Sequence, residues 1–274
     1  METLWIVIMG AIQGATEFLP VSSSGHLAVS QLILAEHGEQ LSDRPFVLEI
    51  VLHLATLLAV IIFYRRHVAA AVVGAGRGIR ALFQGRLGNV LADDDGATMA
   101  MAVVVGTVPT GIIGILVKGV AGHVSRSATG LGLTFLCCAG LLLASRWCAF
   151  KQRKLDWKVA LIIGTIQGLA VLPGISRSGA TIACALALGM DREAAARFSF
   201  LLSIPAIAGA ALVELDLSRI DDGGHALAFA LGGLVAFVIG LAALTLLVRV
   251  VKQGRLWLFA PYVAAVGILT LAAL

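Results

Sequence analysis

Charged residues are scarce in this 274-residue sequence. Asp, Glu, Lys and Arg make up 13% of it, hydrophobic residues make up 59%, and the mean hydropathy is +0.98. A soluble domain of this length carries roughly a quarter charged residues. So large an apolar excess excludes an ordinary soluble protein, because lipid is the solvent that accepts such a surface. No polar stretch is long enough to fold separately, and we predict a single membrane domain over 1–274.

Cysteine motifs and a secretion signal are also missing. The four cysteines form neither a CxxC pair nor a spacing typical of metal ligands, which excludes a cysteine metal centre. The first residues lack the basic region and the small-x-small cleavage pattern of a signal peptide. We therefore interpret the N-terminus as mature sequence that belongs to the fold.

Long apolar runs dominate instead. Six stretches have the roughly 20 residues that a helix needs to cross a bilayer; they are 46–64, 97–117, 127–147, 197–215, 225–250 and 256–274. Two further apolar regions, 3–36 and 158–190, are interrupted near the middle by proline, glycine and serine. Their halves, of roughly 10–17 residues or about 15–25 Å of helix, are too short to cross alone. We predict an all-α polytopic membrane protein with six transmembrane helices and two re-entrant helix–loop–helix hairpins.

Lysine and arginine are distributed unevenly between the two sides of these spans. If the six spans alternate, and Arg177 is set aside, fifteen lie on one side and four on the other. The four are Arg44, Lys118, Arg126 and Arg219. Cytoplasmic loops carry the excess of basic residues, so we expect the richer side to be cytoplasmic and both termini to lie outside. The net charge of +4 then needs no nucleic-acid partner.

The two interrupted regions share three short motifs in the same order. Ile-Gln-Gly, Leu-Pro and Ser-x-Ser-Gly occur at 12–14, 19–20 and 22–25, and again at 166–168, 172–173 and 176–179. The offset is 154 residues for the outer motifs and 153 for Leu-Pro. Three spans lie between the copies, which indicates an inverted-topology repeat, approximately 1–117 and 155–250, with a site near the membrane midplane. Chance similarity between two apolar segments is the alternative.

Arg177 is the only lysine or arginine expected deep in the membrane. Such a charge is costly enough to suggest function, and its planar guanidinium can hold two phosphate oxygens. The helix that follows each break points its free N–H groups at the loop, which favours an anion. Hydroxyl donors gather around the breaks: Ser22, Ser23, Ser24, Ser176, Ser178 and Thr181. A purely structural ion pair between Arg177 and Glu17 is the alternative.

The few carboxylates suggest a metal. Glu17 lies one turn beyond Gln13, and Glu49 lies inside the first span with His53 one turn further on. A carboxylate beside a phosphate needs a bridging cation, and we expect Mg²⁺ or Ca²⁺ bound by Glu17 and Glu49. A cavity-lining or hydrogen-bonded core histidine explains His53 equally well. His26, directly after the first serine cluster, is a candidate nucleophile or proton donor, or else a structural histidine.

The segments 13–26 and 173–181 resemble the undecaprenyl pyrophosphate phosphatases of the bacitracin-resistance family, and the similarity extends over nearly the whole chain, including the Glu49 region and 198–202. The resemblance implies removal of the terminal phosphate from undecaprenyl pyrophosphate, which returns the lipid carrier to cell-wall synthesis and confers bacitracin resistance. It also implies a divalent cation and a site open to the periplasm of the bacterial inner membrane. Glu17 would be the catalytic or metal-binding acid, Arg177 the phosphate clamp, and Ser23 and His26 the nucleophile and acid–base candidates.

Gln13 departs from the family pattern, which often has glutamate at this position. A glutamine can bind a cation or a phosphate but cannot act as a base, so the burden shifts to Glu17, assisted by Glu49. The attack on phosphorus is left to His26, Ser23 or water, and of these we favour His26. A polyprenyl-phosphate flippase is the rival function, because transporters are often built from inverted repeats with broken helices. Glycines at 130–132 and 232–233 suit either internal packing or a homodimer.

Overall fold

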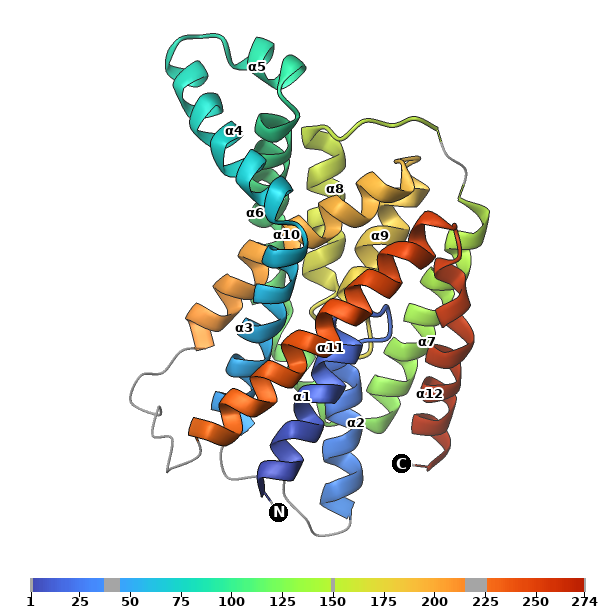
Figure 1. Ribbon diagram of the computed structural model, residues 1–274. Coiled ribbons are helices and arrows are strands. Elements are labelled where there is room, and N and C mark those ends of the chain that lie inside the picture. The colour runs from blue at the N-terminus through green and yellow to red at the C-terminus, as the bar shows by residue number, and fades with distance from the viewer. Residues whose placement is uncertain (1, 37–44, 149–150, 215–225, 274) are drawn as a thin grey trace.

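The computed structural model describes residues 2–36, 45–148, 151–214 and 226–273, and helices make up nearly all of these ranges (Figure 1). Arg44 and Arg219, used above for orientation, lie outside the described residues. The α-helices are α1 Glu2–Phe18, α2 Ser23–Glu36, α3 Pro45–Phe63, α4 Arg65–Phe83, α5 Leu87–Asp93, α6 Asp95–Ser125, α7 Ala128–Ala144, α8 Trp157–Leu169, α9 Arg177–Ala187, α10 Arg192–Glu214, α11 Ala226–Lys252 and α12 Ala260–Ala273.

Several of these helices are long and apolar enough to cross a membrane. Within the described residues five qualify, namely α6, α7, α10, α11 and α12, the last together with the 3-10 turn Leu256–Phe259. A sixth span is counted when α3 and α4, which meet at a bend of 83°, are taken as one. Apolar side chains cover their outer faces; Ile115 of α6, for example, is 74% exposed. The chain is therefore an all-helical protein of the multi-pass membrane type.

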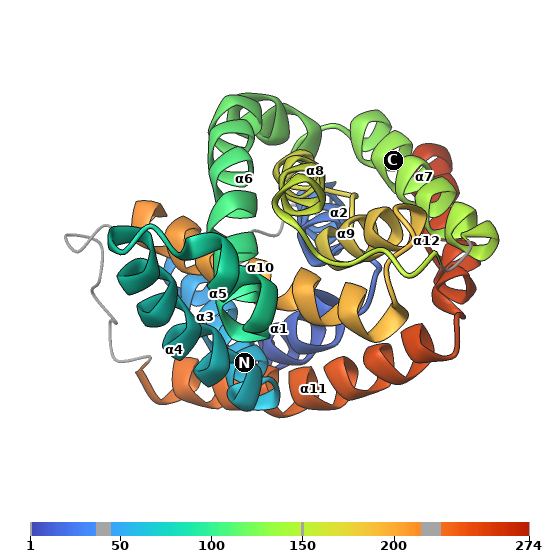
Figure 2. The same ribbon diagram turned by 90° about the horizontal axis from the view of Figure 1, so that it is seen from above.

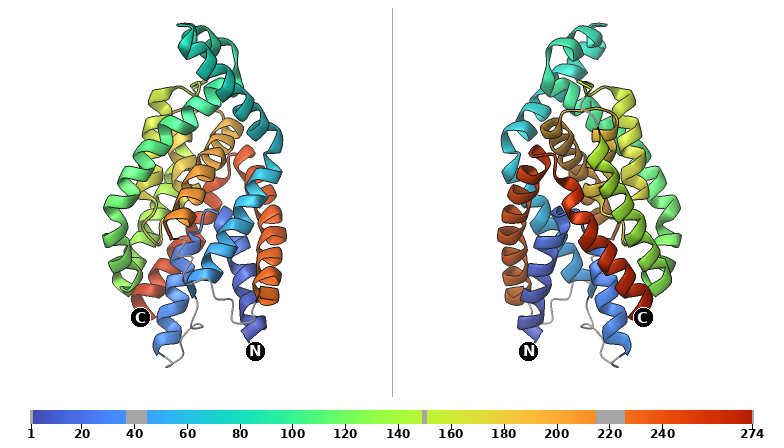
Figure 3. Two further views of the ribbon diagram at one scale, coloured as in Figure 1. Left: turned by 90° about the vertical axis from the view of Figure 1, so that its left-hand side faces the viewer. Right: turned by 90° about the vertical axis from the view of Figure 1, so that its right-hand side faces the viewer.

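The basic segment between the first two expected spans is helical rather than an open loop. α4 and α5 project beyond the other helices, at the end of the molecule opposite to both termini (Figures 1 and 3). α4 packs closely on α6, because a Cβ at Gly74 would lie only 2.2 Å from the backbone nitrogen of Ala97. Asp94 caps α6 by accepting the N–H groups of Gly96 and Ala97, and it also pairs with Arg77 at 2.9 Å. Hydropathy alone did not reveal this arrangement.

Both interrupted regions contain a turn where the sequence predicts one. α1 ends at Phe18 and α2 begins at Ser23, whereas α8 ends at Leu169 and α9 begins at Arg177. Proline cannot continue either helix, and each break also contains a residue with left-handed backbone, Ser22 at φ 68° and Gly174 at φ 93°. In Figure 1, α1 and α2 lie on the side of the termini and α8 and α9 on the side of α5, with their breaks close together at the centre.

Small residues let the short helices pack tightly against long ones. Gly10 of α1 contacts the backbone of Gly232 in α11, and Gly164 of α8 contacts the backbone of Gly106 in α6. Gly10 and Gly164 are themselves 154 residues apart, so the two copies use the same packing position. Seen from above, α6, α7, α11 and α12 surround the central hairpins (Figure 2). Gly132 likewise packs inside the molecule, against Leu271, so these glycines carry no argument for a homodimer.

Candidate active site

The carboxylate of Glu17 is the centre of the site. Its side chain is only 2% exposed and accepts hydrogen bonds from three side chains, one of them charged. Gln13 donates to Oε2 at 2.9 Å from one turn earlier in α1, and the Ser23 hydroxyl donates to the same oxygen at 2.8 Å from the start of α2. A guanidinium nitrogen of Arg177, from the second break, pairs with Oε1. Residues 160 positions apart in the sequence thus meet in one ion pair.

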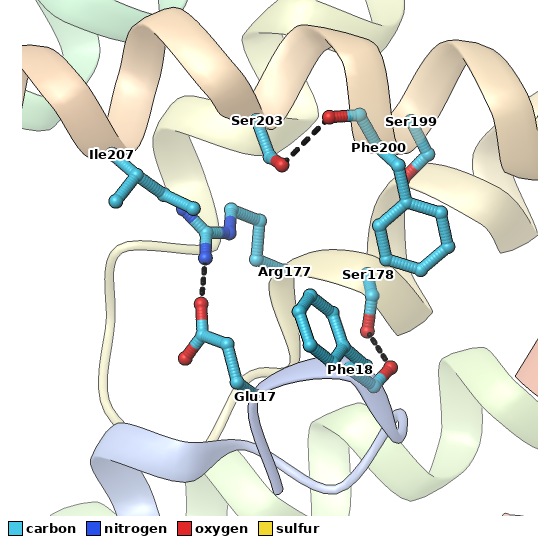
Figure 4. A pocket seen from close by; sticks show the side chains of 8 residues that line it. All are labelled: Glu17, Phe18, Arg177, Ser178, Ser199, Phe200, Ser203 and Ile207. Carbon is cyan, nitrogen blue, oxygen red and sulfur yellow. Dashed lines mark hydrogen bonds and ion pairs between the residues drawn. The ribbon is translucent and has the colours of Figure 1, made fainter. Parts of the chain in front are cut away.

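Arg177 owes its position to the cap of α9. Ser176 is the N-cap residue, and its hydroxyl accepts the backbone N–H of Gly179 at 3.1 Å. Helix α9 therefore begins with Arg177, and the side chain extends across to the end of α1 (Figure 4). About a quarter of it, 27%, is exposed, and the residue lines a cavity on each side of the ion pair. Its remaining N–H groups are thus available to a ligand.

The larger cavity lies between the two breaks and has a volume of about 160 Å³. Its apolar lining comes mainly from the second break, at Ala170, Val171 and Ile175. Its polar lining combines both breaks with one side chain from α3, and comprises Thr16, Glu17, Ser22, Ser23, Ser24, His53, Ser176 and Arg177. Helices α2 and α9 also begin at this cavity, so their N-termini face it. Positive helix ends, hydroxyls and a guanidinium favour an anion such as phosphate.

The smaller cavity, on the α10 side of the ion pair, has room for about one water at 10 Å³ (Figure 4). Ser178 lines it, and its hydroxyl donates to the carbonyl of Phe18 at 2.9 Å. Ser199 and Ser203 line it from α10. Sequence analysis did not assign these two serines a role. Their spacing of one helical turn on the apolar span 197–215 is the signal that could have identified them, because it puts two hydroxyls on one face.

Two expected phosphate ligands are fully buried behind the site. Thr181 is 0% exposed and bonds to the carbonyl of Arg177 at 2.8 Å and to the Ser199 hydroxyl. Gln13 is 1% exposed, and its Oε1 has no hydrogen-bond partner in the described part of the chain. Neither residue lines either cavity. In this structure they support Arg177 and Glu17 from behind, and their contact with a ligand stays a prediction.

His26 lines neither cavity. Its Nδ1 lies 2.8 Å from the carbonyl oxygen of Ser22, and its Nε2 lies 2.8 Å from the hydroxyl of Tyr262 in α12. The ring is stacked on that of Tyr262 and meets the ring of Phe135 edge-on. The structure therefore brings Glu17, Ser23 and Arg177 together at the cavity but leaves His26 outside it.

The first span contributes His53 rather than Glu49 to the cavity. His53 Nε2 lies 3.9 Å from Glu17 Oε2, while its Nδ1 lies 2.9 Å from the backbone carbonyl of Glu49. The exposed Glu49 lines neither cavity. Across the described ranges, no three His, Cys, Asp or Glu side chains are grouped closely enough to hold a metal ion. The pairing of Glu17 with Glu49 as cation ligands stays a prediction.

Comparison with known proteins identifies a family that this chain matches over nearly its whole length. A family model described as bacitracin resistance protein BacA matches residues 6–269 of this chain. An undecaprenyl-diphosphatase of Desulfosudis oleivorans is 46% identical over 99% of this chain and 98% of its own length. Undecaprenyl-diphosphatases of Desulfatibacillum aliphaticivorans and Methanosphaera stadtmanae are 42% and 37% identical, and each alignment covers at least 98% of both chains.

Proposed function

This chain belongs to the bacitracin resistance protein BacA family, and we propose that it is the membrane phosphatase that converts undecaprenyl diphosphate to undecaprenyl phosphate and inorganic phosphate. The monophosphate returns to cell-wall synthesis, and its recycling confers bacitracin resistance. One observation supports this activity above all: Ser23 donates to Glu17 at 2.8 Å, on the same carboxylate that pairs with Arg177. The Ser23 hydroxyl, the Glu17 carboxylate as base and the phosphate-binding guanidinium of Arg177 thus border one cavity.

Ser23 is the nucleophile that this geometry favours. Its Oγ attacks the terminal phosphorus as Glu17 Oε2 accepts the hydroxyl proton. The bond from that phosphorus to the bridging oxygen breaks, and undecaprenyl phosphate leaves with the proton that Glu17 had accepted. Water then attacks the phosphoserine, returns a hydroxyl to Ser23 and releases inorganic phosphate. Two observations argue against attack by His26: it lines neither cavity, and both of its ring nitrogens already have hydrogen-bond partners.

Arg177 and the helix ends stabilise the transferring phosphoryl group. Phosphoryl transfer depends mainly on positioning and on electrostatic stabilisation of the equatorial oxygens. The guanidinium of Arg177 provides donors from the second break, and the first N–H groups of α2 and α9 add partial positive charge. Serine hydroxyls at 22, 24 and 176 line the same cavity and complete the set of donors.

A divalent cation fits beside Glu17. Gln13 leaves a buried carbonyl oxygen without a partner, one turn from the Glu17 carboxylate, and oxygen ligands are what Mg²⁺ and Ca²⁺ prefer. When bound, the cation neutralises charge on the substrate. Glu17, which lines the cavity, would hold it in this chain, with Gln13 as a second ligand if its amide turned the free oxygen toward the cavity.

The membrane orientation is inferred from the positions of the basic helix α4 and of the two termini. The two broken helix pairs form an inverted repeat, with six spans around it, and re-enter the bilayer from opposite faces. Both termini lie at the end opposite the basic helix α4, which supports a periplasmic location for the termini and a cytoplasmic one for α4 in the bacterial inner membrane. The diphosphate enters the large cavity from the periplasmic leaflet while the polyprenyl chain stays in lipid. A homodimer stays a prediction.

Phosphate release from undecaprenyl diphosphate by the purified protein tests this function. We expect release that requires a divalent cation, stops with a chelator and is lost in Ser23→Ala. Thr245→Ala is the matched control, because it removes the hydroxyl of an exposed threonine on α11 that bonds only within its own helix. Transfer of the intact lipid across vesicles without phosphate release would contradict the proposal and favour the flippase.

A further inference from the structure

His26 occupies a closed position next to the first break. Its ring lies parallel to that of Tyr262, with centroids 5.7 Å apart and planes 2° apart, and meets Phe135 edge-on at 5.4 Å. Both ring nitrogens have partners at 2.8 Å, the Ser22 carbonyl oxygen and the Tyr262 hydroxyl. A side chain that contacts Ser22, Tyr262 and Phe135 and lines neither cavity is held in place like a structural support.

The hydrogen bonds determine the tautomer of the ring. A backbone carbonyl oxygen can only accept, so the Nδ1 of His26 must carry the proton it donates to Ser22. In the neutral ring Nε2 is then an acceptor, and the hydroxyl of Tyr262 donates to it. Tyr262, from α12, thereby provides a partner for Nε2 while Nδ1 holds the first break.

Ser22, the residue that His26 holds, has an unusual backbone. Its φ of 68° is in the left-handed region, which only one other non-glycine residue of the described chain, Gln152, adopts. Such a conformation is strained for a non-glycine residue and persists only where the surroundings enforce it. The Ser22 carbonyl accepts both His26 Nδ1 and the His26 backbone N–H. Its hydroxyl accepts the backbone N–H groups of Gly25, at 3.2 Å, and of Gly174 in the second break, at 3.0 Å.

The next residue in the chain is Ser23, whose hydroxyl lies 2.8 Å from Glu17. The direction of the Ser23 side chain therefore depends on the left-handed turn at Ser22. We propose that Tyr262 and His26 are positioning residues for the reaction. Tyr262 binds Nε2 and holds the ring of His26 in place, His26 holds the carbonyl of Ser22, and the turn at Ser22 aims Ser23 at Glu17 and the phosphorus. This role rests on the proposed function, with Ser23 as nucleophile.

Two substitutions of His26 separate positioning from covalent catalysis. The amide nitrogen of asparagine takes the place of Nδ1 and can still donate to Ser22, whereas that of glutamine takes the place of Nε2 and cannot. We expect His26→Asn to stay active and His26→Gln to lose about 100-fold in kcat with little change in KM, because misplacing a reacting group by 1 Å costs about that much. Equal loss in both folded variants would overturn the proposal, and so would equal activity.

Tyr262→Phe is the milder test, since it keeps the stacked ring and removes only the hydroxyl. We expect a lower kcat, an unchanged KM, and a shifted His26 Nε2 resonance in the side-chain ¹⁵N NMR spectrum, with the proton still on Nδ1. A wild-type kcat would refute the role of Tyr262. If the wild-type protein itself releases no phosphate, the proposed function fails and the positioning role fails with it; wild-type turnover combined with a failed variant test refutes the positioning role alone.

Discussion

Removal of Arg177 has two separable effects, one on folding and one on turnover. Glu17 is 2% exposed, so Arg177→Ala leaves its buried carboxylate without the guanidinium that balances its charge. Breaking such a pair from one side costs about 3–5 kcal/mol. Gln13 and Ser23 still donate to the carboxylate, and water can reach the position of a side chain that is 27% exposed. We therefore expect a loss near the lower limit, about 3 kcal/mol of unfolding free energy.

Turnover should suffer independently of folding. Losing one preorganised donor to the transition state costs about 2.7–4 kcal/mol, or roughly 10²–10³ in kcat, and arginines in phosphoryl transfer reach 10³ or more. We expect at least a 10³-fold loss. The double variant Glu17→Gln with Arg177→Gln removes both charges, so it should regain most of the lost stability but none of the activity. Thermal unfolding in detergent and phosphate release measure the two effects. Near-wild-type activity in Arg177→Ala, or recovered activity in the double variant, would refute the reasoning.

Two further changes test the packing of the breaks and the cation. A Cβ at Gly25 would lie 2.6 Å from Phe135 and 2.7 Å from the nitrogen of Gly174. Gly25→Ala should therefore lower the free energy of unfolding by about 1–3 kcal/mol and lower kcat. Gly119→Ala, whose Cβ would meet nothing within 4 Å, is the control and should do neither. Unchanged stability in Gly25→Ala would contradict the close contact between the breaks. Gln13→Glu adds a carboxylate beside Glu17 and should lower the cation concentration needed for half-maximal activity, in a titration after chelator treatment. A higher requirement would place the cation elsewhere.

The elements that define this protein could be predicted from the sequence because lipid imposes simple rules. A bilayer requires long apolar helices, and a charge such as Arg177 stands out against them. The interruptions at Pro20 and Pro173 are also visible in the sequence, and the structure brings Glu17, Ser23 and Arg177 together at these breaks. Local chemistry was enough to identify the members of this group.

Other features depend on contacts that no local pattern reveals. The partner of His26 is Tyr262, 236 residues away, and only the tertiary packing of α12 against the first break brings them together. The left-handed backbone of Ser22 decides which hydroxyl faces Glu17, and a row of three serines gives no indication of it. Helix α4 was missed because its arginines satisfied a topological rule, although Gly74 packs it firmly on α6.

The most direct test of the central claim is a rapid acid quench of the working enzyme with undecaprenyl diphosphate labelled at the terminal phosphate. A phosphoserine ester survives acid, whereas a phosphohistidine does not. We expect acid-stable label on the peptide that contains Ser23, and none in Ser23→Ala. Label that survives a parallel alkaline quench but not the acid one and maps to His26, or steady turnover by Ser23→Ala, would show that the hydroxyl held by Glu17 is not the group that attacks.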